Sequence, residues 1–123
     1  MSQDIISDAL NQIMNAKRVE KTQIVLQRKS KLLIELFKMM KKAKHIDFKE
    51  DGRTVTVTIL NLNECRAIKP RYNVMIHEID KYLRRFLPSR NFGTVVVSTS
   101  KGLLTHEEAY NEKIGGSLIA YYY

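Results

Sequence analysis

The chain has 123 residues, of which 44% are hydrophobic and 28% are charged. This length allows one ordinary domain or two small ones that share an interface, and the composition is globular rather than disordered. The apolar runs are too short to cross a bilayer, and residues 1–10 lack the basic start and apolar core of a secretory signal. We therefore expect a protein of the cytoplasm or nucleus.

The net charge of +8 is concentrated in one part of the chain, residues 17–49, which we call the basic segment. It contains 11 basic and 3 acidic side chains, whereas the other 90 residues contain 10 of each. Such a segment is typical of a protein with a polyanionic partner. Nucleic acid is favoured over a membrane because no Trp or strongly amphipathic Phe anchor accompanies the charge. The alternative is a solvated lysine-rich helix face.

Apolar residues near the start recur with the 3.6-residue period of a helix. They are Ile5, Ile6, Ala9, Leu10, Ile13 and Met14. Ser2 or Asp4 can cap the start of this helix. Asn15, Lys17 and Arg18 follow at its end, where cations favour the negative pole of the helix dipole and can equally reach a phosphate.

A short strand is predicted at residues 22–27, and a second helix follows it. Ser30 is placed to cap that helix, and its apolar residues repeat the same spacing at Leu32, Leu33, Leu36, Phe37 and Met40. Residues 46–50 and 53–59 then flank Asp51-Gly52, which is a strong hairpin signal. This order predicts two helices on one side of a small sheet.

Residues 61–69 show no periodicity, and Pro70 follows them, so we expect the boundary between two subdomains there. The predicted subdomains are residues 1–62 and residues 63–123. A strand is predicted at residues 72–76. A short helix ended by Pro88 follows, with one face formed by Ile79, Leu83, Phe86 and Leu87.

A buried strand is predicted at residues 93–98. Thr105 and Glu108 have the spacing of a capping box, which opens a helix that ends before Gly115. Residues 118–123 form an apolar closing strand. The second subdomain is therefore mostly β with two short helices, and the fold class is α+β.

The most distinctive stretch follows the buried strand, and we call it the hydroxyl turn. It consists of Ser98, Thr99, Ser100, Lys101 and Gly102. Gly102 can adopt a positive φ and let the chain turn. Three hydroxyls and a mobile cation suit phosphate and sugar oxygens better than an apolar ligand. The alternative is a serine-rich turn without a ligand.

Arg71 and Tyr72 follow the rigid Pro70. An arginine and an aromatic side chain in this position can pair with and stack on nucleotides. A partly buried tyrosine beside a solvated arginine is the alternative.

The chain shows no pattern typical of a catalytic, metal or cofactor site. His45, His77 and His106 lie far apart in the sequence, and Cys65 is the only cysteine. Glu107-Glu108 is interpreted as a first-turn charge pair of a helix rather than as an acid and a base. We expect no enzyme activity, no cofactor, no metal and no small-molecule substrate.

The carboxy-terminal half resembles the small-subunit ribosomal protein S-eight family, in its archaeal and cytosolic eukaryotic branch. The motifs that carry the resemblance are Pro70-Arg71-Tyr72, residues 87–93, residues 98–109 and Ile114-Gly115-Gly116 with the aromatic end of the chain. Asp8-Ala9-Leu10 and Asn15-Ala16 are similar to the family's first helix. The resemblance spans nearly the whole chain and is weaker at residues 28–51.

The resemblance implies two α+β subdomains and direct binding of small-subunit ribosomal RNA at a helix with an irregular internal loop. It also implies a role in subunit assembly and translation, contacts with neighbouring ribosomal proteins, binding to its own mRNA, and a nucleolar stage in a eukaryote. The implied RNA-binding residues are Asn15, Lys17, Arg18, Lys29, Ser30, Lys31, Arg71, Tyr72, Ser98, Thr99, Ser100, Lys101, Gly102, Gly115 and Gly116.

The chain departs from the family pattern at three places. Arg28, Lys29 and Ser30 replace a proline and two small polar residues. A glycine usual before the third strand is replaced in the Lys44-His45 region, and Ser117 stands where many relatives have Glu or Lys. The alternative functions are an RNA- or DNA-binding regulator outside the ribosome, which would use the same basic segment, and an RNA-processing enzyme, which would require an acid, base or metal cluster around residues 98–101.

Overall fold

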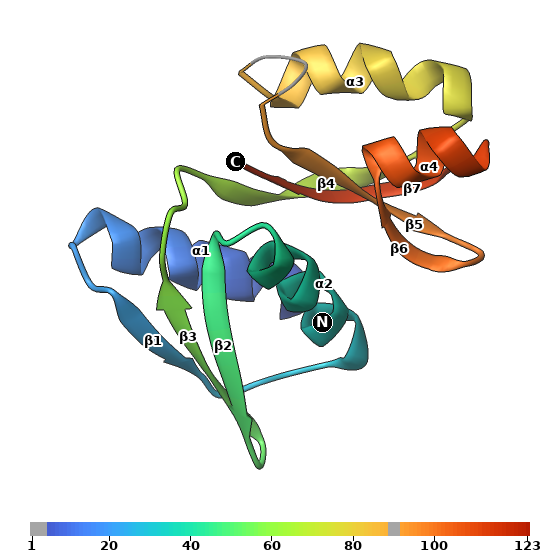
Figure 1. The fold of residues 1–123 in the computed structure, drawn as a ribbon. Coiled ribbons are helices and arrows are strands. Elements are labelled where there is room, and N and C mark those ends of the chain that lie inside the picture. Colours follow the sequence, from blue (N-terminus) through green and yellow to red (C-terminus); the bar gives the residue numbers. More distant parts are fainter. Residues whose placement is uncertain (1–4, 89–91) are drawn as a thin grey trace. The chain divides into compact units, whose positions relative to one another are not determined.

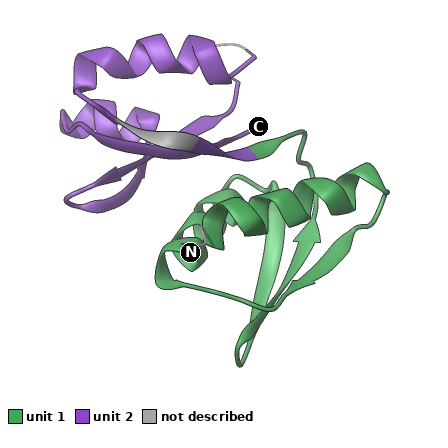
Figure 2. Cartoon of the chain, turned by 180° about the vertical axis from the view of Figure 1, so that it is seen from behind, with its two compact units in different colours: residues 1–65 green, residues 66–123 purple. Residues whose placement is uncertain are grey.

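The computed structural model describes residues 5–88 and 92–123, apart from the side chains of residues 69–72. The chain divides into two compact units, residues 1–65 and residues 66–123, which we call unit 1 and unit 2 (Figure 2). Both units contain helices and a β-sheet, which confirms the predicted α+β class. The predicted helix caps Ser2 and Asp4 lie outside the described residues.

Unit 1 has the predicted order of helix, strand, helix, strand and strand. Its elements are α1 (Ile5–Arg18), β1 (Gln23–Leu26), α2 (Lys31–Lys42), β2 (Ile46–Asp51) and β3 (Thr54–Ile59). The strands are antiparallel in the order β1-β3-β2, and both helices lie on one face of the sheet (Figure 1). The core contains Ile6, Leu10, Ile13, Leu26, Leu33, Leu36, Phe37, Met40, Val55 and Val57. The predicted apolar stripes are therefore the buried faces of α1 and α2.

Local signals in unit 1 form as the sequence predicts. The Ser30 hydroxyl accepts a hydrogen bond from the Leu33 N–H at 3.1 Å and caps α2. In the hairpin, Asp51 pairs with Thr54, so the two turn residues are Gly52 and Arg53, one position later than predicted. Gly52 adopts φ +58°, a conformation that glycine adopts without a Cβ penalty.

Three of the helices end with a non-glycine residue in the left-handed conformation. Glu20 after α1, Lys44 after α2 and Lys113 after α4 have φ angles of 61°, 64° and 57°. At the end of α2, the N–H of His45 donates to the Met40 carbonyl at 3.0 Å and the N–H of Lys44 donates to the Lys41 carbonyl at 2.9 Å. This is the Schellman pattern, in which glycine is the usual residue.

Unit 2 places two helices on one face of a four-stranded sheet (Figure 1). Its elements are β4 (Cys65–Val74), the 3₁₀ helix η1 (Ile76–Glu78), α3 (Ile79–Phe86), β5 (Thr94–Thr99), β6 (Gly102–Thr105), α4 (His106–Glu112) and β7 (Gly116–Tyr122). The strand order is β4-β7-β5-β6. The core includes Val74, Ile79, Leu83, Leu87, Val95, Val97, Ala109 and Leu118.

Several predictions for unit 2 are confirmed. Ile79, Leu83 and Leu87 are buried on one side of α3. The capping box opens α4, because the Thr105 hydroxyl accepts from the Glu108 N–H and the Glu108 carboxylate accepts from the Thr105 N–H, each at 3.1 Å.

Two local predictions differ from the structure. The strand predicted at residues 72–76 is β4, which begins earlier, at Cys65, and ends earlier, at Val74. A proline cannot donate to a sheet ladder, but β4 lies at the edge of the sheet, where proline is tolerated. Leu103-Leu104 was not assigned to a strand, yet it pairs with Ser98 and Val97 as part of β6.

Within the described residues, no helix has the length and apolarity needed to span a membrane. Cys65 is buried and, as the only cysteine of the chain, forms no internal disulfide. Its Sγ lies 3.8 Å from the Leu10 carbonyl, and its N–H points to the sulfur of Met14 at 3.3 Å.

Candidate nucleic-acid interface

The hydroxyl turn is a tight β-hairpin that is stabilised by the side chain of Thr99, one of its own residues. Thr99 closes β5 and pairs with Gly102, which opens β6 with φ +102°. The Thr99 hydroxyl donates to the Gly102 carbonyl at 2.9 Å and accepts from the Lys101 N–H at 3.1 Å. The Thr99 side chain, at one end of the turn, therefore bonds the backbone of Lys101 inside the turn and of Gly102 at the other end, so the backbone geometry is set before any ligand binds.

The remaining polar side chains of this turn are directed to the outside. Ser100 is exposed and Ser98 is half-buried. Lys101 Nζ lies 3.2 Å from Glu112 Oε2, and the two side chains are 60% and 52% exposed. An ion pair this exposed is worth at most about 1 kcal/mol, so a phosphate can replace the carboxylate at low cost.

Two residues outside the predicted RNA-binding set join Ser98 on the sheet: Ser117, noted above only as a departure from the family pattern, and Asn73. Ser117 lies opposite Ser98 in the β5–β7 register, and its hydroxyl donates to Asn73 Oδ1 at 2.5 Å. Each of these three residues adjoins a core residue in the chain, respectively Val97, Leu118 and Val74. Because side chains alternate along a strand, Ser98, Ser117 and Asn73 share the sheet face opposite α3 and α4. The alternation of side chains along each strand predicts which residues share a face, but it does not predict which residues lie opposite one another on neighbouring strands.

Gly115 and Gly116 have an intramolecular role. A Cβ at Gly115 would lie 2.5 Å from the Val74 carbonyl oxygen, and one at Gly116 would overlap the carbonyl oxygen of Ser98. Both glycines therefore allow the start of β7 to approach the neighbouring backbone closely. Gly116 places this backbone directly beside the hydroxyl turn.

In unit 1, three predicted residues lie together at the start of α2. A surface pocket of about 390 Å³ is lined by Lys29, Ser30, Lys31, Ile34, Glu35, Lys38 and Glu50. Lys29 Nζ lies 3.1 Å from Glu50 Oε1, and the Ser30 hydroxyl is occupied as the helix cap. Because Lys29 and Lys31 lie at the amino terminus of α2, this place favours the binding of an anion.

A separate exposed group lies at the carboxyl end of α1 and consists of Asn15, Lys17 and Arg18. Arg28, next to Lys29 in the chain, lines a small pocket with residues from the first turns of α1, including Ile5 and Asp8. A helix of 14 residues is about 20 Å long, so the predicted cations of the basic segment form two groups rather than one patch.

Some cations of the basic segment have acidic neighbours. Lys41 Nζ lies 3.2 Å from Asp47 Oδ1, and this hydrogen bond, with a second from the Phe48 N–H, lowers the pKa of the Asp47 carboxyl.

Arg71 and Tyr72 lie in β4, but their side chains are outside the described part of the chain, so their roles stay predictions. Among the described residues, no group of His, Cys, Asp or Glu could hold a metal ion.

Comparison with known proteins shows which family the chain belongs to. The family model described as Ribosomal protein S8 matches residues 4–123. The chain is 34%, 36% and 34% identical to proteins named small ribosomal subunit protein uS8 from Eremothecium gossypii, Neurospora crassa and Kluyveromyces marxianus. Each similarity covers 97% of this chain and 96% of the relative. The chain therefore belongs to the ribosomal protein S8 family.

Proposed function

We propose that this protein is a structural component of the small ribosomal subunit, which binds small-subunit ribosomal RNA at a helix with an irregular internal loop. It then supports subunit assembly and translation on the ribosome and performs no chemistry. The observation that carries the proposal is the hydroxyl turn, whose shape is set by the two hydrogen bonds of Thr99. The names of the relatives support the ribosomal assignment.

The chemistry of the turn matches that of RNA. The minor groove of an RNA duplex is wide and shallow, and it displays 2′-hydroxyls and base edges. Short hydroxyl side chains such as Ser98 and Ser100 reach these groups, while Lys101 reaches a phosphate. Gly115 and Gly116 let the adjoining backbone lie close to the RNA. Arg71 and Tyr72 are proposed to pair with and stack on nucleotides.

The basic segment supplies the affinity that does not depend on sequence. Asn15, Lys17, Arg18, Lys29, Ser30 and Lys31 are the residues of unit 1 that we assign to RNA. If about 4 to 6 phosphates are neutralised, the logarithm of affinity falls with the logarithm of salt concentration at a slope of roughly 3 to 5. Residues 63–123 form the subdomain that reads RNA shape.

Family membership supports further partners. Neighbouring proteins of the small subunit contact the chain, and its own mRNA is a second RNA ligand. In a eukaryote, a nucleolar assembly stage precedes the cytoplasmic ribosome. An RNA-binding regulator outside the ribosome would use the same cations, so binding to RNA alone does not separate the two functions.

Footprinting on small-subunit RNA, combined with sedimentation in high salt, tests the proposal. We expect protection confined to one irregular internal loop and stoichiometric sedimentation with the small subunit. Protection spread along regular duplex, or loss of the protein from the subunit in high salt, would favour a regulator outside the ribosome.

Arg71→Ala is expected to weaken binding and lower the salt slope by about one unit, whereas Tyr72→Ala leaves that slope unchanged.

A further inference from the structure

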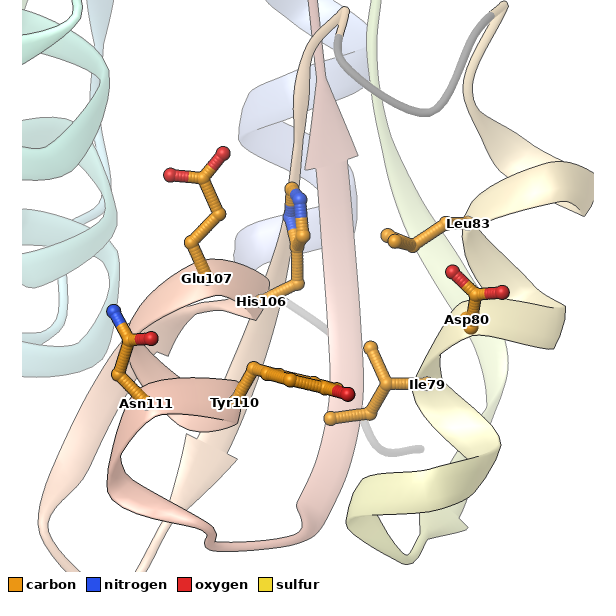
Figure 3. A pocket seen from close by; sticks show the side chains of 7 residues that line it. All are labelled: Ile79, Asp80, Leu83, His106, Glu107, Tyr110 and Asn111. Atoms are coloured by element: carbon orange, nitrogen blue, oxygen red, sulfur yellow. The ribbon is translucent and has the colours of Figure 1, made fainter.

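Unit 2 has a groove between its two helices that the proposed RNA interface does not use. It has a volume of about 300 Å³ and lies between α3 and α4 (Figure 3). Its lining residues are Ile79, Asp80, Leu83, His106, Glu107, Tyr110 and Asn111. A groove with exposed apolar surface on a small protein is a candidate contact for another molecule.

The groove combines an apolar floor with an exposed aromatic ring. Ile79 and Leu83 of α3 are buried core residues that form the floor. Tyr110 extends from α4 toward Ile79, and it is 62% exposed (Figure 3). An exposed tyrosine in a groove presents a ring face that a planar or cationic group can cover.

The charge of the groove is opposite to that of the chain. Asp80 and Glu107 are acidic, and none of the residues that line the groove is Lys or Arg. The seven residues of α4 include Glu107, Glu108 and Glu112 but no Lys or Arg. In a chain of net charge +8, this is a surface that disfavours a phosphate backbone and favours a cationic ligand.

A nearby cation does not close the groove. Arg84 lies 3.5 Å from the Asp80 carboxylate, but the Arg84 side chain is 75% exposed. An exposed pair at successive helix turns contributes a few tenths of a kcal/mol, so an incoming cation can share or replace it.

His106 offers a hydrogen-bond donor at the floor. Its Nδ1 accepts from the Val95 N–H at 3.2 Å, so in the neutral ring the proton is on Nε2. Burial lowers the pKa of His106, which favours this neutral form. Within the described part of the chain the ring makes no second hydrogen bond, so its Nε2–H can donate to a peptide carbonyl.

We propose that this groove binds an arginine-containing peptide segment of a partner protein. One guanidinium stacks on Tyr110 and pairs with Glu107 or Asp80, and the peptide backbone lies along the floor over Leu83. Arginine fits better than lysine because its planar group can stack on the ring and bond a carboxylate at the same time. The proposal rests on unit 2 alone and does not depend on the RNA-binding function.

The test measures binding of a fluorescently labelled peptide of alternating Arg and Gly to the full-length chain at about 0.15 M salt, by anisotropy. A peptide of alternating Lys and Gly is the probe of charge alone. Tyr110→Ala should weaken binding of the arginine peptide about 2- to 5-fold, the range expected for an exposed cation–π contact. Tyr110→Phe should restore it, and the lysine peptide should bind more weakly.

Controls separate the groove from general charge and from RNA. Glu107→Gln should weaken arginine-peptide binding, whereas Asp51→Asn, which removes an exposed carboxylate from unit 1, should not. Thermal melting checks that each variant folds. Equal peptide affinity of Tyr110→Ala and the unaltered chain, or equal effects of Glu107→Gln and Asp51→Asn, would overturn the proposal. A loss of RNA affinity in Tyr110→Ala would instead assign the groove to nucleic acid.

Discussion

In unit 1 the candidate RNA contacts are mainly long cationic side chains at the end of α1 and the start of α2, whereas in unit 2 they are mainly short side chains on a hairpin. Lys17 and Lys31 are exposed and can follow a phosphate as it moves. The hydroxyl turn, in contrast, is bonded internally by Thr99 and placed against Gly116. The difference indicates that unit 1 supplies charge and unit 2 supplies shape.

This division has a physical basis. Phosphate contacts position a protein on RNA but carry no sequence information, and their strength falls with salt. Recognition of an irregular helix requires donors and acceptors at fixed positions, since ordering a mobile side chain on binding costs about 0.5–1.5 kcal/mol. Variants that loosen unit 2 should therefore damage specificity, and variants that remove charge from unit 1 should not.

Gly116→Ala should have the largest effect. The new Cβ would overlap the Ser98 carbonyl oxygen, so either β5 or β7 must move. We expect a loss of about 3 kcal/mol of unfolding free energy, the upper end for overpacking. Gly52→Ala is the control, because nothing lies within 4 Å of its added Cβ; it should cost about 1 kcal/mol through its positive φ. Denaturant titration measures both, and similar losses would contradict the account.

Thr99→Val should come next. It keeps the branched shape but removes both hydrogen bonds of the turn, with an expected loss of roughly 1 to 3 kcal/mol in binding of the cognate internal-loop RNA. Nonspecific duplex binding should hardly change. Thr99→Ser, which keeps the hydroxyl, is the matched control. The interpretation is wrong if the valine variant binds the cognate RNA as tightly as the serine variant.

Lys44→Gly should stabilise unit 1. Lys44 occupies the left-handed position at the end of α2, where a Cβ costs about 1 kcal/mol that glycine avoids. Lys113→Gly should do the same at the end of α4 in unit 2. Lys42→Gly, inside the last turn of α2, should instead destabilise by about 1 kcal/mol. Thermal melting of the three variants checks this, and a destabilised Lys44→Gly would contradict it.

Lys101→Ala tests the one cation of the hydroxyl turn. It should weaken binding of cognate RNA and plain duplex by the same factor and reduce the salt slope by about one unit. The control is Lys81→Ala, which also removes one positive charge from unit 2, but on α3 and outside the hydroxyl turn. It should change the salt slope less than Lys101→Ala does. A selective loss on the cognate RNA would mean that Lys101 reads RNA shape.

The buried His106 gives unit 2 a stability that depends on pH. Burial lowers the pKa of His106 below its usual value of 6.5, so the unfolded chain binds more protons than the folded one as the pH falls below about 6.5. The contribution of His106 to stability should be complete above that pH and be lost as the pH falls below it. Thermal melting across this pH range checks it: His106→Gln should flatten the profile below about pH 6.5, and an unchanged profile would contradict the assignment.

Much of the fold follows from signals within a few residues. The stripes of α1 and α2, the cap at Ser30 and the box of Thr105 and Glu108 are local patterns, and each is confirmed. The strand predicted at residues 72–76 missed the first residues of β4, because residues 61–69 lack periodicity and Pro70 fits a strand only where that strand lies at a sheet edge.

The candidate site was harder to predict from the sequence than the fold was. The hydroxyl turn was apparent from composition, but the internal role of the Thr99 hydroxyl depends on how β6 pairs with β5. The contacts of Ser117 with Asn73 and of Lys29 with Glu50 join residues 44 and 21 positions apart. Such partners are set by sheet register and helix packing, which no single stretch of sequence encodes.

The most direct test of the division between charge and shape is the ratio of affinities for the cognate internal-loop RNA and a plain duplex. Ser100→Ala removes an exposed hydroxyl from the hydroxyl turn without touching the bonds of Thr99, and Lys29→Ala with Lys31→Ala removes two cations from unit 1. We predict that the serine variant lowers the ratio about 3- to 10-fold, in line with one lost hydrogen bond, and leaves duplex binding unchanged. The lysine pair should weaken both RNAs equally and reduce the salt slope by roughly 1.5 units. An unchanged ratio in Ser100→Ala, together with a lowered ratio in the lysine pair, would contradict the account.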